Sequence, residues 1–137
     1  MLEWRSAMNL LIVDDEYLVV EEVVTVTDWE LLGITEIYSA TNAVSAVRIL
    51  NEKKIDIMIC DIEMPQTDGL ELSKKAKENF PDLEIVMLTS HAEFNYVRNA
   101  LRYGCYDYLL KPVMEDDIIK VMKNLVTKIE RERHQAQ

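Results

Sequence analysis

Five polar side chains of this sequence could act together in chemistry, because they stand at the ends of apolar runs. They are Asp14, Asp15, Asp61, Thr89 and Lys111. Clustered carboxylates repel one another, so a hard cation such as Mg²⁺ is a fitting partner. A carboxylate can also form an aspartyl phosphate, and a hydroxyl and an ammonium group can stabilise phosphoryl charge. Taken singly, each residue could equally be a turn residue, a helix cap or a solvated charge.

The elements that must position these side chains alternate along the chain. The predicted strands are residues 8–13, 34–39, 56–60, 83–88 and 106–110, and the predicted helices are residues 17–27, 42–52, 70–79, 93–103 and 115–133. This alternation predicts an α/β fold, a five-stranded parallel sheet covered by helices on both faces. Ligands bind at the carboxyl ends of the strands in such sheets, so the five side chains should converge there.

Apolar spacing predicts which face of each helix is buried. In the helix that Thr41 or Asn42 can cap, the expected buried positions are Val44, Val47 and Leu50. In the helix at residues 17–27, the apolar positions are Leu18, Val19, Val23 and Val24.

Composition narrows the class of protein. A chain of 137 residues with 49% hydrophobic residues suits one domain. No apolar run reaches the ~18 residues of a membrane span, and residues 1–7 lack a signal core, which predicts a soluble cytoplasmic protein. A net charge of −10 disfavours nucleic acid or an anionic membrane as a direct partner. Cys60 and Cys105 are expected to be buried, reduced thiols.

Four segments carry a resemblance to a known family. They are LLIVDDE, DIMICDIEMPQTDGLEL, EIVMLTS and DYLLKPV. In this order and spacing they resemble the receiver domains of two-component response regulators. The resemblance implies the flavodoxin-like receiver fold, with five parallel strands in the order 2-1-3-4-5.

The resemblance also implies a metal site and a phosphoacceptor. Asp61 would accept the phosphoryl group. Asp14, Asp15 and Asp61, with the backbone carbonyl of Glu63, would hold Mg²⁺, and Asp15 would be a direct ligand.

Further roles follow from the same resemblance. Thr89 would hydrogen-bond the phosphoryl group, and Lys111 would pair with it. Pro112 would follow a cis peptide bond. Thr89 and the aromatic residue Tyr108 would together form the switch.

The implied partner is a sensor histidine kinase that presents a phosphohistidine. After transfer to Asp61, the surface formed by residues 93–103, 106–110 and the helix from residue 115 would repack, and homodimerisation through it is one plausible output. The protein would not be an enzyme beyond slow loss of its own phosphate.

Some positions depart from the usual pattern. Ser90 replaces the more common Ala or Gly but is still small. Glu63 and His91 lie two residues beyond Asp61 and Thr89, where the family tunes phosphoryl lifetime. His91 could act in catalysis or simply lie exposed.

The segment DWELLGI resembles receivers of regulators that carry an AraC-type DNA-binding domain. We expect a receiver domain at residues 8–130, with extensions at residues 1–7 and 131–137. The chain could be a piece of a longer transcriptional regulator that contacts DNA only through a separate output domain.

Two other classes remain open: an enzyme or ligand binder of similar fold, and an interaction module. A haloacid-dehalogenase-like phosphatase would have an acid at Glu63 but Thr or Val, not Pro65, two residues later; a nucleotide or flavin binder would need glycines where DDEYL has none. An interaction module that has lost phosphate chemistry is the main alternative, although the polar set is intact.

Overall fold

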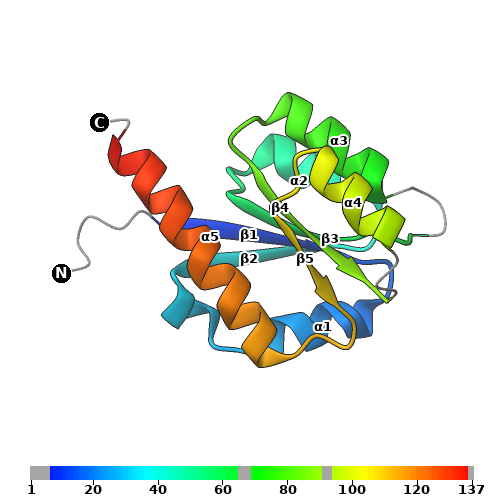
Figure 1. Ribbon diagram of the computed structural model, residues 1–137, viewed down its shortest axis with the longest axis horizontal. Helices are drawn as coiled ribbons and strands as arrows, with labels where there is room; N and C mark the ends of the chain where they lie inside the picture. Colours follow the sequence, from blue (N-terminus) through cyan, green and yellow to red (C-terminus); the bar gives the residue numbers. More distant parts are fainter. Residues whose placement is uncertain (1–6, 65–68, 91–93, 136–137) are drawn as a thin grey trace.

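The computed structural model describes residues 7–64, 69–90 and 94–135, and the side chains of all of these except 94–97. The elements are β1 (Met8–Val13), α1 (Tyr17–Thr25), the 3₁₀ helix η1 (Trp29–Leu32), β2 (Ile34–Ala40), α2 (Ala43–Glu52), β3 (Ile57–Asp61), α3 (Gly69–Asn79), β4 (Glu84–Thr89), α4 (Phe94–Arg102), β5 (Asp107–Leu110) and α5 (Glu115–Gln135). All pairings are parallel and the strand order is β2-β1-β3-β4-β5, which confirms the predicted fold and order (Figure 1).

Helices cover both faces of this sheet. Figure 1 shows α1 and α5 on one face and α2, α3 and α4 on the other. The strands are therefore apolar on both sides, and every residue of β3 and β4 is buried. This explains why the strands read as continuous apolar runs rather than as alternating patterns.

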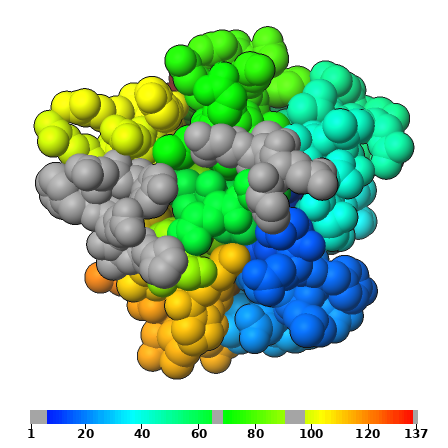
Figure 2. All heavy atoms as spheres, turned by 90° about the vertical axis from the view of Figure 1, so that its right-hand side faces the viewer, coloured from blue at the N-terminus to red at the C-terminus, as the bar shows by residue number. Residues whose placement is uncertain are grey.

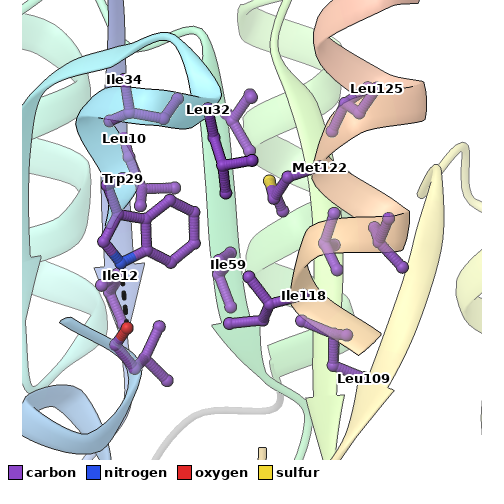
Figure 3. Close-up of a cluster of buried hydrophobic side chains, with 14 of the residues drawn as sticks. Leu10, Ile12, Trp29, Leu32, Ile34, Ile59, Leu109, Ile118, Met122 and Leu125 are labelled. Atoms are coloured by element: carbon purple, nitrogen blue, oxygen red, sulfur yellow. Dashed lines mark hydrogen bonds between the residues drawn. The ribbon is translucent and has the colours of Figure 1, made fainter. Parts of the chain in front are cut away.

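The core beneath α1 and α5 is closed by η1. Trp29 lies buried in the layer between the sheet and α5, near Leu32 and Met122 (Figure 3). Its indole Nε1 donates a hydrogen bond of 3.0 Å to the carbonyl oxygen of Val23 at the end of α1. The segment after α1 is thus a packing element and not only a turn.

The predicted buried face of α2 is wrong in part. Val44 is 82% exposed and Val47 is also exposed, whereas Ala46 and Leu50 are buried. Both stripes have helical spacing, so periodicity could not choose between them, and the sheet surface accepts the smaller Ala46. The predicted cap is confirmed, because the Asn42 side chain accepts a hydrogen bond from the Ser45 N–H.

The buried face of α1 also includes only some of the apolar residues of this helix. Val20 and Val23 are the buried residues of this helix, whereas Leu18 and Val24 are exposed. The helix ends at Thr25, two residues before the predicted end. A surface helix buries only a stripe, and α1 carries more apolar residues than that stripe can hold.

The remaining sequence expectations concern single positions. Gly104 has a φ of 92° and follows α4, as expected for a glycine that ends a helix. Cys60 and Cys105 are buried free thiols, as predicted. Within the described part of the chain, none of the helices combines the length and apolar character needed to span a bilayer.

Candidate functional site

Strand register brings the polar side chains to one end of the sheet. Val13 pairs with Cys60, so the next residues, Asp14 and Asp61, become neighbours. One hydrogen bond beyond the strands extends each ladder. These bonds run from the Asp14 N–H to the Ala40 oxygen (3.1 Å), from the Ile62 N–H to the Leu88 oxygen (2.9 Å) and from the Lys111 N–H to the Thr89 oxygen (2.8 Å). The backbone of the site is therefore held by the sheet itself.

Three carboxylates meet at this end. Oxygen atoms of Asp14, Asp15 and Asp61 all lie within 4.8 Å of one another. Asp14 and Asp61 are buried, whereas Asp15 is exposed. Figure 2 views this end of the molecule, where the blue start of α1, the green segment around the start of α3 and the orange segment after β5 lie side by side. The structure thus brings together residues that are far apart in the sequence.

Lys111 is the cation closest to these carboxylates among the described contacts. Its Nζ lies 2.9 Å from Asp14 Oδ2 and 3.4 Å from Asp61 Oδ1. Burial lowers the pKa of Lys111, but its 2.9 Å ion pair with Asp14 and the nearby charge of Asp61 outweigh burial and raise this pKa above its ordinary value. Lys111 is therefore favoured in its charged form beside the carboxylates of Asp14 and Asp61.

Asp61 lies in a protected and partly compensated position. Its Oδ1 accepts a hydrogen bond of 3.1 Å from the Glu63 N–H and faces Lys111. Burial raises the pKa of Asp61, and the charge of Asp14 adds to the rise, while the Glu63 N–H and Lys111 oppose it. Both contacts fall on Oδ1, so neither of them uses Oδ2.

The chemistry of this donor set fits a hard divalent cation. Asp14 Oδ1 accepts a hydrogen bond of 2.8 Å from the Glu16 N–H, but the buried Oδ2 has no well-angled hydrogen bond in the described structure, although Lys111 lies close to it. Three clustered carboxylates and one ammonium leave an excess of negative charge. Oxygen ligands with an incomplete protein cage are typical of Mg²⁺ sites.

Thr89 and Glu63 form a contact that the sequence did not indicate. The Thr89 hydroxyl, buried at the end of β4, donates a hydrogen bond of 3.0 Å to Glu63 Oε1. Glu63 itself is exposed and follows β3. A contact between side chains that are 26 positions apart depends on strand register, so no local sequence pattern predicts it.

The other predicted positions are placed as follows. The Lys111–Pro112 peptide bond is cis, as the resemblance implied. Tyr108 is half-buried against the core beneath α2 and α3, and Ser90 is exposed after β4. His91 lies outside the described residues. The roles predicted for Thr89, Tyr108 and the Glu63 carbonyl stay predictions.

Comparison with known proteins identifies similarity over nearly the whole chain. The family model "Response regulator receiver domain" matches residues 10–123. The transcriptional regulatory protein YesN of Bacillus subtilis is 34% identical over 124 residues, which cover 90% of this chain and 34% of YesN. This chain also covers 49% of a response regulatory protein of Staphylococcus epidermidis. It therefore spans only a third to a half of the length of these relatives.

Solved structures agree with this result. The receiver domain of AraT, a response regulator from Geobacillus stearothermophilus, has a TM-score of 0.86 and 30% identity, with 93% of this chain and 99% of that chain covered. A two-component transcriptional regulator AraC from Clostridium phytofermentans has a TM-score of 0.84 and 25% identity, covering 96% of this chain and 100% of that chain. With the acidic cluster and Lys111 at the carboxyl ends of its strands, this chain belongs to the response regulator receiver domain family.

Proposed function

We propose that this chain is a phosphoacceptor receiver domain of a two-component system, which takes a phosphoryl group from a histidine kinase onto Asp61. The cluster of Asp14, Asp15 and Asp61 within 4.8 Å carries this proposal, together with Lys111 Nζ at 2.9 and 3.4 Å from two of them. Membership of the receiver family supports it.

The proposed reaction is a single phosphoryl transfer. An oxygen of the Asp61 carboxylate attacks the phosphorus of a phosphohistidine, the P–N bond breaks and the imidazole leaves with the electron pair of that bond. Lys111, already charged beside Asp61, stabilises the negative charge of the phosphoryl oxygens. The Thr89 hydroxyl then donates a hydrogen bond to the acyl phosphate.

Asp14, Asp15, Asp61 and the backbone carbonyl of Glu63 would hold Mg²⁺ beside the reacting carboxylate. When bound there, Mg²⁺ would offset the negative charge on the phosphoryl oxygens. The charge balance of the site supports this assignment, because the single ammonium group of Lys111 cannot neutralise three clustered carboxylates.

The proposed output is a change at the surface formed by α4, β5 and α5. Tyr108 lies on β5, within that surface, and Thr89 at the end of β4 pairs with Leu110 of β5. A charge change at Asp61 can therefore bias this element, with homodimerisation as one output. Similarity to YesN and to the AraC regulator supports a role in transcription control, and membership of the receiver family supports a cytoplasmic location.

The test is phosphorylation by a small donor. The purified chain is incubated with acetyl phosphate and Mg²⁺ and weighed by intact mass spectrometry, beside Asp61→Asn. We expect one added phosphoryl mass in the parent that requires Mg²⁺ and is absent in the variant.

Asp28→Asn is a matched control, since Asp28 is exposed and its side chain forms no cap hydrogen bond. This variant should be phosphorylated like the parent. A folded parent that gains no mass and binds no beryllofluoride would instead be a phosphate-independent interaction module.

A further inference from the structure

The side chain of Glu63 is the one part of that residue that the proposed chemistry does not use. Its backbone N–H already donates to Asp61 Oδ1 at 3.1 Å, and its backbone carbonyl is assigned to the metal. Its carboxylate instead reaches across to β4 and accepts a hydrogen bond of 3.0 Å from the Thr89 hydroxyl. Glu63 therefore contacts both the phosphoacceptor and the predicted switch residue.

We propose that the Glu63 carboxylate is a latch that holds the Thr89 hydroxyl away from Asp61 until the phosphoryl group arrives. Glu63 acts here as a positioning residue for Thr89. This inference rests on the proposed function, because it assigns a regulatory contact to the same site.

The latch works because Glu63 and the phosphoryl group compete for one hydrogen-bond donor, the Thr89 hydroxyl. A threonine hydroxyl has one O–H donor, so Thr89 cannot fully serve Glu63 and a phosphoryl oxygen at the same time. The Thr89 backbone cannot shift to serve both, because its carbonyl oxygen accepts the Lys111 N–H at 2.8 Å within the sheet. Only rotation of the side chain can transfer the hydroxyl from one acceptor to the other.

The charge of the phosphoryl group would release the latch. Phosphorylation adds roughly 1.5 to 2 negative charges at pH 7, and these repel a nearby carboxylate. Glu63 is exposed, so water can solvate its carboxylate when it turns away, whereas the Thr89 hydroxyl is buried and is stabilised by an acceptor within the site. The phosphoryl oxygen is that acceptor.

The experiment compares Glu63→Ala with Glu63→Gln, which both keep the backbone N–H and carbonyl of residue 63. Alanine removes the acceptor, whereas glutamine removes the charge but keeps an amide oxygen. With Mg²⁺ present, beryllofluoride is titrated against each protein. We expect about fivefold tighter binding in Glu63→Ala, the effect of one net hydrogen bond, and a value near the parent's in Glu63→Gln.

A double-mutant cycle isolates the contact. In a Thr89→Val background the hydroxyl is gone, so Glu63→Ala should no longer change beryllofluoride affinity. Equal tightening in the Ala and Gln variants would assign the effect to charge alone and overturn the latch. An effect of Glu63→Ala that persists beside Thr89→Val would overturn it as well.

A second measurement needs no phosphoryl chemistry. The NMR signal of the Thr89 methyl group is recorded in the unphosphorylated proteins. It should shift in Glu63→Ala, where the hydroxyl has lost the Glu63 acceptor, and stay near the parent position in Glu63→Gln. A parent that fails to bind beryllofluoride sinks the proposed function, whereas an unmoved methyl signal in Glu63→Ala sinks the latch.

Discussion

The buried environment of Asp61 disfavours the charge of its own carboxylate. It is 2% exposed, lies beside the buried Asp14 and depends on Lys111 and one backbone N–H for compensation. A carboxylate held in this way is destabilised before reaction and gains from any partner that brings positive charge. The same physics that suits Asp61 for phosphoryl transfer makes it a source of instability in the metal-free protein.

Replacing this carboxylate should therefore stabilise the fold. We expect Asp61→Asn to raise the free energy of unfolding at pH 7 without Mg²⁺, measured by urea denaturation. Burial raises the pKa of Asp61 in the folded state. Ionisation of Asp61 therefore does not lower the free energy of unfolding below its ordinary pKa of about 3.9, where the carboxyl is protonated in both states. The full loss of stability is present only above the pKa of the folded state.

The pH dependence is the check on this prediction. The stability of the parent should fall relative to Asp61→Asn as pH rises through that window, and the two should converge as pH is lowered toward about 4. Asp28→Asn, at an exposed aspartate, should show no such divergence. An advantage of Asp61→Asn that is the same at both pH values would contradict this explanation.

At the level of elements, α3 begins in contact with the phosphoacceptor strand. A Cβ atom built on Gly69 would lie only 2.0 Å from the Asp61 carbonyl oxygen. No side chain can occupy that position unless the end of β3 or the start of α3 moves. Glycine is required here by close backbone approach and not by a left-handed φ.

Gly69→Ala should reverse the usual preference of helices for alanine. Propensity alone favours alanine by about 1 kcal/mol, but the clash should make the variant less stable by about 2 kcal/mol. Denaturant unfolding measures the change, and mass spectrometry should show slower phosphorylation of Asp61.

Gly104→Ala is the matched control, because its cost of about 1 kcal/mol arises from a φ of 92° in a place remote from Asp61. That variant should keep the parental phosphorylation rate. A stabilised Gly69→Ala protein would contradict the predicted clash.

The 3₁₀ helix η1 offers a second comparison within one element. Trp29 is buried against α5 and bonded to Val23, whereas Leu31, two residues later, is 79% exposed. Trp29→Ala should cost about 3–5 kcal/mol of stability and Leu31→Ala less than about 0.5 kcal/mol. Similar losses from the two variants in thermal or urea unfolding would show that η1 does not close this core.

The whole molecule separates its charges between the two ends of the sheet. At the carboxyl ends the acidic cluster is only partly compensated, as the proposed chemistry requires. At the amino ends, the buried Asp56 and Glu84 are paired with Arg133 and Lys128 of α5. The pairs of Arg133 with Asp56 and of Lys128 with Glu84 attach the end of α5 to the sheet. The acidic cluster at the other end is left available for reaction.

Breaking one of these pairs should loosen α5. Arg133→Ala leaves Asp56 buried, with the Asn9 N–H still donating to Asp56 Oδ2 at 2.7 Å. We expect a loss of about 2 kcal/mol in unfolding free energy, because a buried carboxylate without its cation is costly. Amide hydrogen exchange should also accelerate in the last turns of α5.

The control is Lys75→Ala, which breaks an exposed pair with Glu71 across one turn of α3. Its cost should not exceed about 0.5 kcal/mol. An equally small cost for Arg133→Ala would show that the pair with Asp56 does not hold α5 in place.

Much of the fold could be predicted because its signals are local. Residues buried on both sides of a sheet must be apolar, so the strands stand out, and Asn42 and Gly104 marked helix ends by their capping chemistry. The faces of α1 and α2 could not be predicted, since Leu18 and Val44 have helical spacing yet lie exposed. Which stripe is buried depends on the opposing sheet surface.

The amino-acid sequence by itself determined the strand order through the family resemblance and the identity of Asp14, Asp15, Asp61, Thr89 and Lys111 as the polar set. Only the tertiary structure decided how these groups contact one another. Lys111 between two carboxylates, the hydrogen bond from Thr89 to Glu63 and the close approach of Gly69 to Asp61 all depend on strand register. Register is a property of pairing between distant segments, so no local pattern encodes these contacts.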